Sequence, residues 1–392
     1  MNYLISPTPG LVFSALRSLV LLVLVIPATA SVRAGEPPVP PERSSLSASA
    51  LRDCLGKAAS GNCLDQIFRD FLADRSTKEA LAAIKRYQES DADLRLSCHV
   101  LVHSVGRESF RRPGTIHGAF SACDQTCHSG CYHGAVERFL WGELADAQAP
   151  PHVTQQMLKA RAHTACAPEL ALRLRFQCLH GLGHAVLHFA AYRLKTALEI
   201  CDTLPDVWSR RSCYGGVFME NITAAVPERR DLSPTDYHYP CSQLDAQYRS
   251  DCYMMQTSRM AEMGLTLQNL FQECVRAGAY AEPCIQSIGR DLANEARLRG
   301  ADAAAASCEL AAGKARQDCI RGAAYALIDY TWDGQYALPF CNALSNHESS
   351  RYCFEQTIRH LRNLVSPSTS ELRSQCEKYA GGREACLLAS SW

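Results

Sequence analysis

The sequence predicts an all-α protein, a right-handed α/α solenoid of about ten helical hairpins of about 34 residues, each stapled by a disulfide. Two observations support this fold class: ten of the twenty cysteines recur about every 34 residues, and apolar residues follow helical spacing between them. A period of this length is typical of a two-helix unit that buries its apolar face only by stacking on its neighbours. The periodic cysteines are Cys63, Cys98, Cys131, Cys178, Cys213, Cys252, Cys284, Cys319, Cys353 and Cys386.

The other ten cysteines indicate how the hairpins are cross-linked. Nine of them precede a periodic cysteine by 8 to 12 residues. Elimination then pairs the tenth, Cys127, with Cys98, the one periodic cysteine that lacks such a partner. An even, locally paired set is typical of an oxidising compartment, where disulfides persist. The expected pairs are Cys54–Cys63, Cys98–Cys127, Cys123–Cys131, Cys166–Cys178, Cys201–Cys213, Cys241–Cys252, Cys274–Cys284, Cys308–Cys319, Cys341–Cys353 and Cys376–Cys386.

The first thirty residues have the pattern of a secretory signal peptide. Arg17 precedes a short apolar run, and small residues end the run at Ala30, where we expect cleavage. The run is too short to span a membrane, so we expect an exported protein, periplasmic or secreted, with no membrane span. Residues 31–50 are rich in Pro and Ser and are expected to form a flexible linker.

The remaining chain divides by composition into three parts of one array. We expect an N-terminal capping repeat over residues 51–97, histidine-rich repeats over 98–192 and further helical repeats over 193–392. In four units a glycine stands three places after the periodic cysteine, which indicates that two helix backbones approach closely there. These glycines are Gly134, Gly181, Gly216 and Gly322.

In its period and its cysteine staples the chain resembles tetratricopeptide-like helical repeat proteins of the exported, disulfide-stapled kind. The resemblance covers nearly the whole mature chain at the level of architecture, while the signature residues of tetratricopeptide repeats are not visible. It implies a curved stack with a concave surface that can bind a protein or peptide.

Ten of the thirteen histidines lie between His99 and His188, and this concentration is the strongest functional signal. Three sets with four-residue spacing begin one or two residues after a periodic cysteine, on the second helices of consecutive units, so their side chains share one helix face. Imidazoles arranged in this way can hold a metal ion. The expected ligands are His99, His103, His133, His180 and His184, with His188 and Glu137 supporting them from behind.

The identity of the metal and the reaction stay open at this point. Imidazole suits copper, zinc and iron, and Met219, which shares its offset from a periodic cysteine with Glu137 and His184, favours copper slightly. Whether the protein is an enzyme is left open; Glu137 and Glu108 are the candidate catalytic bases. A thiolate metal site at Cys123, Cys127 and Cys131 and a non-covalent haem are weaker alternatives.

Composition excludes several other function classes. Forty basic residues balance forty acidic ones, and no basic stripe appears, so nucleic acid is not an expected partner. The chain contains no nucleophile elbow, phosphate-binding loop or dinucleotide fingerprint. Two hypotheses remain: a metalloenzyme or metal carrier, and a protein–protein interaction scaffold with no metal and no catalysis.

Overall fold

The computed structural model describes residues 45–57, 60–142, 154–224, 227–379 and 383–390, which all belong to one compact unit, Arg43–Trp392. Within these ranges every regular element is a helix and no strand occurs, which confirms the all-α class. The signal peptide expected over residues 1–30 lies outside the described residues, as does most of the expected linker. None of the described helices combines the length and the apolar character needed to cross a bilayer.

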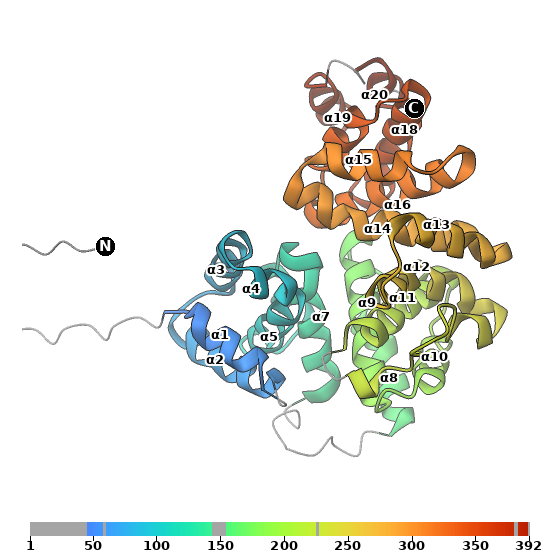
Figure 1. Cartoon of the computed structure of the whole chain (residues 1–392). Helices are drawn as coiled ribbons and strands as arrows, with labels where there is room; N and C mark the ends of the chain where they lie inside the picture. The colour runs from blue at the N-terminus through green and yellow to red at the C-terminus, as the bar shows by residue number, and fades with distance from the viewer. Residues whose placement is uncertain (1–44, 58–59, 143–153, 225–226, 380–382, 391–392) are drawn as a thin grey trace, which may run out of the picture. The chain divides into compact units, whose positions relative to one another are not determined.

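The helices follow one another without any other regular element (Figure 1). The first group is α1 (Ala48–Leu55), α2 (Ser60–Asp74), α3 (Thr77–Ser90), α4 (Ala92–Leu96), α5 (Cys98–Phe110), α6 (Ile116–Ala122) and α7 (Thr126–Trp141). The second group is α8 (Gln155–Ala165), α9 (Leu172–Phe189), α10 (Leu194–Cys201), α11 (Val207–Thr223), η2 (Pro227–Arg229), η3 (Cys241–Gln243), α12 (Ala246–Glu262), α13 (Leu267–Arg276) and η4 (Gly278–Tyr280). The third group is α14 (Ala281–Arg299), α15 (Ala301–Glu309), α16 (Gly313–Thr331), α17 (Ala337–Ala343), α18 (His347–Leu364), α19 (Thr369–Cys376) and α20 (Arg383–Ser390).

Helix α1 begins at Ala48, inside the range that composition predicted to be linker, because Ser47 caps it: the Ser47 hydroxyl accepts a hydrogen bond from the Ala50 amide. Several other helices begin at side-chain caps of the same kind. At α3 the cap is reciprocal, since the Glu79 amide donates to the Ser76 hydroxyl at 3.2 Å and the Ser76 amide donates to the Glu79 carboxylate at 2.9 Å.

Ten disulfides join the cysteines in the pairs that the spacing predicts. Nine of them connect a short helix or turn to the N-terminal half of the next helix, as Cys274 of α13 does with Cys284 of α14. The tenth, Cys98–Cys127, connects the starts of two long helices, α5 and α7. Nearly all of these cysteines are buried, so the cross-links are part of the hydrophobic core.

The long helices pack in the order in which they occur in the chain. Helix α5 contacts α7, α7 contacts α9, and α9 contacts α11; the same succession continues through α12, α14, α16 and α18 to α20. The three successive helices α5, α7 and α9 therefore lie next to each other. These are the helices that carry most of the histidines.

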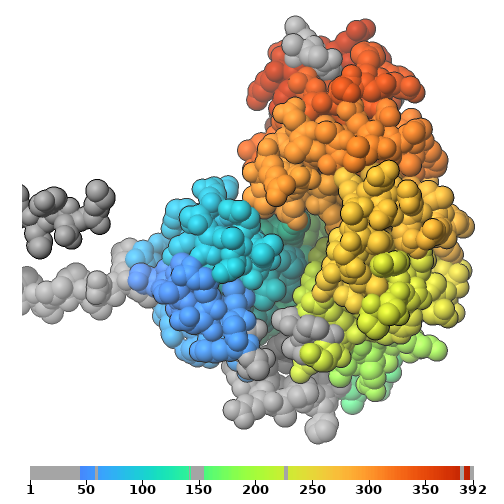
Figure 2. Space-filling view, viewed as in Figure 1, coloured from blue at the N-terminus to red at the C-terminus, as the bar shows by residue number. Residues whose placement is uncertain are grey.

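Two contacts depart from this succession, and the first is the packing of α16 against α7. The Gln125 side chain donates to the Thr331 carbonyl at 3.2 Å, and the rings of Tyr132 and Trp332 lie 5.6 Å apart. Arg297 of α14 also donates to Gln88 of α3 at 3.2 Å, so the orange and cyan surfaces meet in Figure 2. A linear array with contacts only between neighbours does not predict this approach.

Candidate metal centre

Four histidines from α5, α7 and α9 converge on one point. His99 and His103 lie one turn apart on α5, His133 lies on α7, and His184 lies on α9. Each offers one ring nitrogen, and these four nitrogens all lie within 4.8 Å of one another. His103, His133 and His184 are buried, whereas His99 is partly exposed. We refer to these four residues as the four-histidine cluster.

In the described part of the chain, two of the four nitrogen atoms at the middle of the cluster have only each other as hydrogen-bond partners, and the other two have none. The Nε2 atoms of His99 and His103 are 3.0 Å apart and face each other. Nδ1 of His133 and Nε2 of His184 are buried and have no hydrogen-bond partner among the described residues. A buried polar atom left unsatisfied costs about 1–3 kcal/mol. A cation bound between the four rings would satisfy these atoms together.

The outer nitrogen of each ring contacts an oxygen atom that can only accept a hydrogen bond. Each ring therefore donates its N–H outward and turns the lone pair of its other nitrogen to the middle, which is the arrangement that orients histidine ligands around a metal. The pairs are His99 Nδ1 with the Cys127 carbonyl at 2.8 Å, His103 Nδ1 with Glu137 at 2.6 Å, His133 Nε2 with Gln177 at 3.0 Å, and His184 Nδ1 with Glu220 at 2.9 Å.

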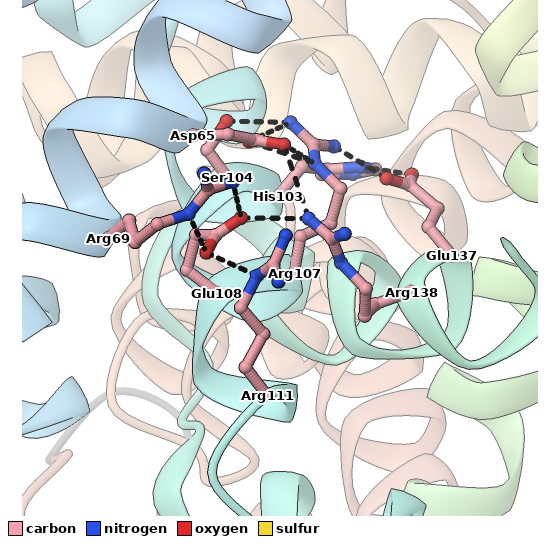
Figure 3. Close-up of polar contacts among 9 residues, drawn as sticks. All are labelled: Asp65, Arg69, His103, Ser104, Arg107, Glu108, Arg111, Glu137 and Arg138. Carbon is pink, nitrogen blue, oxygen red and sulfur yellow. Dashed lines mark hydrogen bonds and ion pairs between the residues drawn. The ribbon is translucent and has the colours of Figure 1, made fainter. Parts of the chain in front are cut away.

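The carboxylate behind His103 is itself held by an arginine (Figure 3). Arg107 donates to Glu137 at 2.6 Å and, through its other nitrogens, to Asp65 at 2.8–3.0 Å. All three side chains are largely buried. Burial disfavours the charged carboxylate, but the contacts with His103 and Arg107 outweigh it and hold the pKa of Glu137 well below its usual value. Glu137 is thus an anion fixed in place behind His103.

A second carboxylate in Figure 3, Glu108, is surrounded by guanidinium groups. It accepts hydrogen bonds from Arg69 at 3.1 Å and Arg138 at 2.8 Å, and Arg111 lies 2.7 Å away. These contacts connect α5 to α2 through Arg69 and to α7 through Arg138. Glu108 therefore stabilises the helix packing beneath the cluster, which is not the position expected for a base acting at the metal.

Behind His184 the carboxylate of Glu220 is held differently. Its second oxygen accepts a hydrogen bond from the hydroxyl of Tyr192 at 2.9 Å, so a neutral donor takes the place that Arg107 has at Glu137. Burial opposes ionisation of Glu220, but the hydrogen bond from His184 lowers its pKa. The two carboxylates differ in that only one is paired with a fixed cation.

Glycines set the distance between the helices that carry the ligands. A side chain at Gly134 of α7 would clash with the His103 carbonyl of α5, and one at Gly106 of α5 would clash with the Cys131 carbonyl of α7. Gly183 of α9 and Gly216 of α11 are related in the same way, since each faces the backbone of the other helix. The close approach that the recurring glycines predict is confirmed at all four positions, Gly134, Gly181, Gly216 and Gly322. Backbone contact, rather than side-chain packing, fixes the spacing of the ligand helices.

Electrostatics keeps the cluster ready for a cation. Burial, and then the neighbouring imidazoles, hold the pKa values of His99 and His133 well below the ordinary value. Both rings are therefore neutral at pH 7, which is the form that binds metals.

The remaining predicted residues lie around the cluster. The ring of His180 is 5.1 Å from the rings of both His133 and His184, but His180 is not one of the four residues whose nitrogens converge. His188, one turn beyond His184, lies next to Tyr192 at 5.8 Å and behind the cluster. Glu137 contacts Nδ1 of His103 from outside the cluster. No contact between Met219 and the four histidines is observed among the described residues, whereas Glu220, one position later, reaches His184.

Three supporting groups were not anticipated from the sequence: Gln177, Glu220 and the Cys127 carbonyl. The carbonyl belongs to a run of left-handed residues, because Cys127, His128 and Ser129 have φ values of 55°, 57° and 62°. Such values are uncommon outside glycine and carry strain. The run interrupts α7 and allows the Cys127 carbonyl to accept the hydrogen bond from His99. Nothing in the local residue types signals this turn.

Comparisons with protein-family models, with curated proteins and with solved structures gave no match for this chain. The function is therefore inferred from the site alone.

Proposed function

We propose that this chain is an exported metalloprotein whose four-histidine cluster holds one copper, zinc or iron ion as a resident centre. The observation that carries the proposal is the orientation of the rings: each of the four donates outward to a fixed acceptor and leaves one nitrogen for the middle. Chance packing of histidines does not require four matched outer partners.

A resident ion fits the geometry better than a transported one. Three of the four ligands are buried, and the outer acceptors hold every ring in place. Such a preformed site favours tight binding and slow release. When bound, the ion supplies a Lewis-acid or redox centre. We therefore favour a metalloenzyme, and a metal carrier is the second hypothesis for the same site.

The donor set narrows the choice of metal. All twenty cysteines form disulfides in the described structure, so thiolates do not take part. Four imidazoles complete the tetrahedral shell that zinc prefers, whereas copper(II) and iron accept further ligands. In the order of intrinsic affinities copper(II) binds nitrogen ligands most tightly, so we expect it to bind most strongly.

We also propose that the helices form the right-handed α/α solenoid of about ten hairpins that the cysteine period predicts, similar to tetratricopeptide-like arrays. The succession of contacts from α5 to α20 supports this, and a concave face for a protein or peptide partner is part of the same proposal. The ten disulfides support export to a compartment that is not reducing.

The test is elemental analysis of the full mature chain, produced with its disulfides formed, after removal of loosely bound metal. We expect about one ion per chain in the wild type and a large loss in the His103→Ala and His184→Ala variants. His163→Ala is the matched control, because His163 is exposed on α8, and it should retain the ion. A metal-free wild type, or an ion retained in both cluster variants, would refute the proposal and favour the interaction scaffold.

A further inference from the structure

The four-histidine cluster has one less buried edge. His99 is its only partly exposed member, and the ring of His128, which is also partly exposed, lies 6.2 Å from the ring of His99. The other three ligands are buried. A molecule arriving from solvent would therefore approach the ion past His99 and His128.

Two residues from distant parts of the chain stand at this edge. The rings of His128 and Tyr330 of α16 are 4.0 Å apart, and a hydrogen bond joins His128 Nε2 to the Tyr330 hydroxyl. The hydroxyl in turn donates to the side-chain oxygen of Asn294 on α14. Asn294 is exposed to solvent. His128 thus donates its own proton to Tyr330, and polar groups line the approach.

Arg297 places an uncompensated positive charge beside these groups. Its guanidinium lies 4.8 Å from the centre of the Tyr330 ring and donates to the neutral Gln88 side chain at 3.2 Å. Among the described residues no carboxylate lies within ion-pair distance of Arg297, and its Nε is buried without a partner. Arg299 on the same helix, by contrast, pairs with Glu295 at 3.3 Å. A partly buried cation without a counter-ion is unfavourable unless an anion is supplied.

We propose that the centre takes a small anionic ligand, either a carboxylate or an inorganic oxyanion such as phosphate. The ligand enters at the His99 edge and binds the ion with Arg297 as its counter-charge. This inference rests on the proposed metal function. The position of Arg297 supports it: the guanidinium lies over the Tyr330 ring at this edge and has no carboxylate partner among the described residues. Tyr330 and Asn294 hold the polar edge in place and connect α16 and α14 to α7.

The test uses the full mature chain loaded with copper(II) and titrated with azide, whose binding to the ion is followed by charge-transfer absorption. We expect Arg297→Gln to bind azide roughly 10- to 100-fold more weakly, because a charge-assisted contact is lost. Arg297→Lys keeps the charge and should retain most of the affinity. Arg299→Gln is the matched control on the same helix and should leave azide binding unchanged. Displacement of azide by acetate would identify a carboxylate as the ligand class, and displacement by phosphate would identify an inorganic oxyanion.

Three results would overturn the inference: azide excluded from the metal-loaded wild type, equal azide affinity in wild type and Arg297→Gln, or displacement by neither acetate nor phosphate. Copper content is measured in every variant, so a loss of the ion is separated from a loss of anion binding. If the wild type binds no metal, the proposed function itself fails, which is a different outcome from a loaded protein that excludes azide.

Discussion

Oε1 of Glu137 lies 2.6 Å from Nδ1 of His103, so a carboxylate on α7 fixes the ring of a ligand on α5. The contact crosses the interface between the two helices, and Arg107 holds the carboxylate from its other oxygen. Glu137 and Arg107 therefore orient the His103 ring and also hold α5 against α7.

Replacing Glu137 by Gln should weaken metal binding by about 10- to 100-fold, because the amide no longer carries the charge that strengthens His103 as a ligand. Arg107 keeps its partner Asp65 in this variant, so the fold should persist. Competition with a chelator of known affinity measures the change. Unaltered affinity in Glu137→Gln would show that the carboxylate only packs the helices.

Gly134→Ala should destabilise the protein by about 1–3 kcal/mol, because the added methyl group meets the His103 carbonyl and forces α5 and α7 apart. The ligand nitrogens move with the helices, so metal affinity should fall as well. Urea unfolding and metal content are the measurements. Gly61→Ala on α2 is the control: nothing lies within 4 Å of the added carbon, and alanine favours a helix by up to ~1 kcal/mol.

Replacing Cys98 and Cys127 together by Ser should cost about 2–4 kcal/mol of stability and reduce metal content strongly. His99 follows Cys98 directly, and the Cys127 carbonyl orients its ring, so this disulfide holds both ends of that contact. The same double change at Cys376 and Cys386 in the last hairpin should leave the metal in place. Equal metal loss in both variants would indicate a general effect of disulfide removal.

The metal-free protein should lose stability as the pH falls below about 6.5, the ordinary pKa of histidine. Burial, followed by the charges of Arg297 and Arg290, lowers the pKa of His128 to about 3. Between these values the unfolded chain binds a proton that the folded chain does not, so acid favours unfolding. Chemical denaturation at several pH values measures the slope.

His128→Asn is the informative variant for this prediction, since asparagine tolerates the left-handed backbone at position 128. Its stability should fall less steeply with acid than that of the wild type. An identical slope would assign the acid sensitivity to other groups, such as His99 and His133, whose pKa values are also lowered.

Cysteine spacing predicted more of this structure than any other feature of the sequence, because each local pair marks the bend of one hairpin. The four-residue spacing of the histidines predicted the cluster but included His180 as a ligand. Residues at the same distance in sequence from their periodic cysteines do not lie equally close to the cluster on neighbouring helices, because packed helices cross at an angle. For the same reason Glu220, and not Met219, reaches His184.

Long-range features had no sequence signal. The contact between Tyr330 and His128 joins residues 202 positions apart, and a period of about 34 residues describes only neighbouring units. The left-handed turn at Cys127 depends on tertiary contacts rather than on a turn-forming residue such as glycine. Both features lie next to the cluster.

If the chain is exported and binds the proposed ion, the bond between Cys98 and Cys127 also sets the order of its maturation. In a reducing cytosol the two sulfurs stay unlinked, and His99 does not yet have its orienting carbonyl beside it. The disulfide then has to form before the four-histidine cluster can bind its ion, so the protein would take up a metal that is available outside the cytosol.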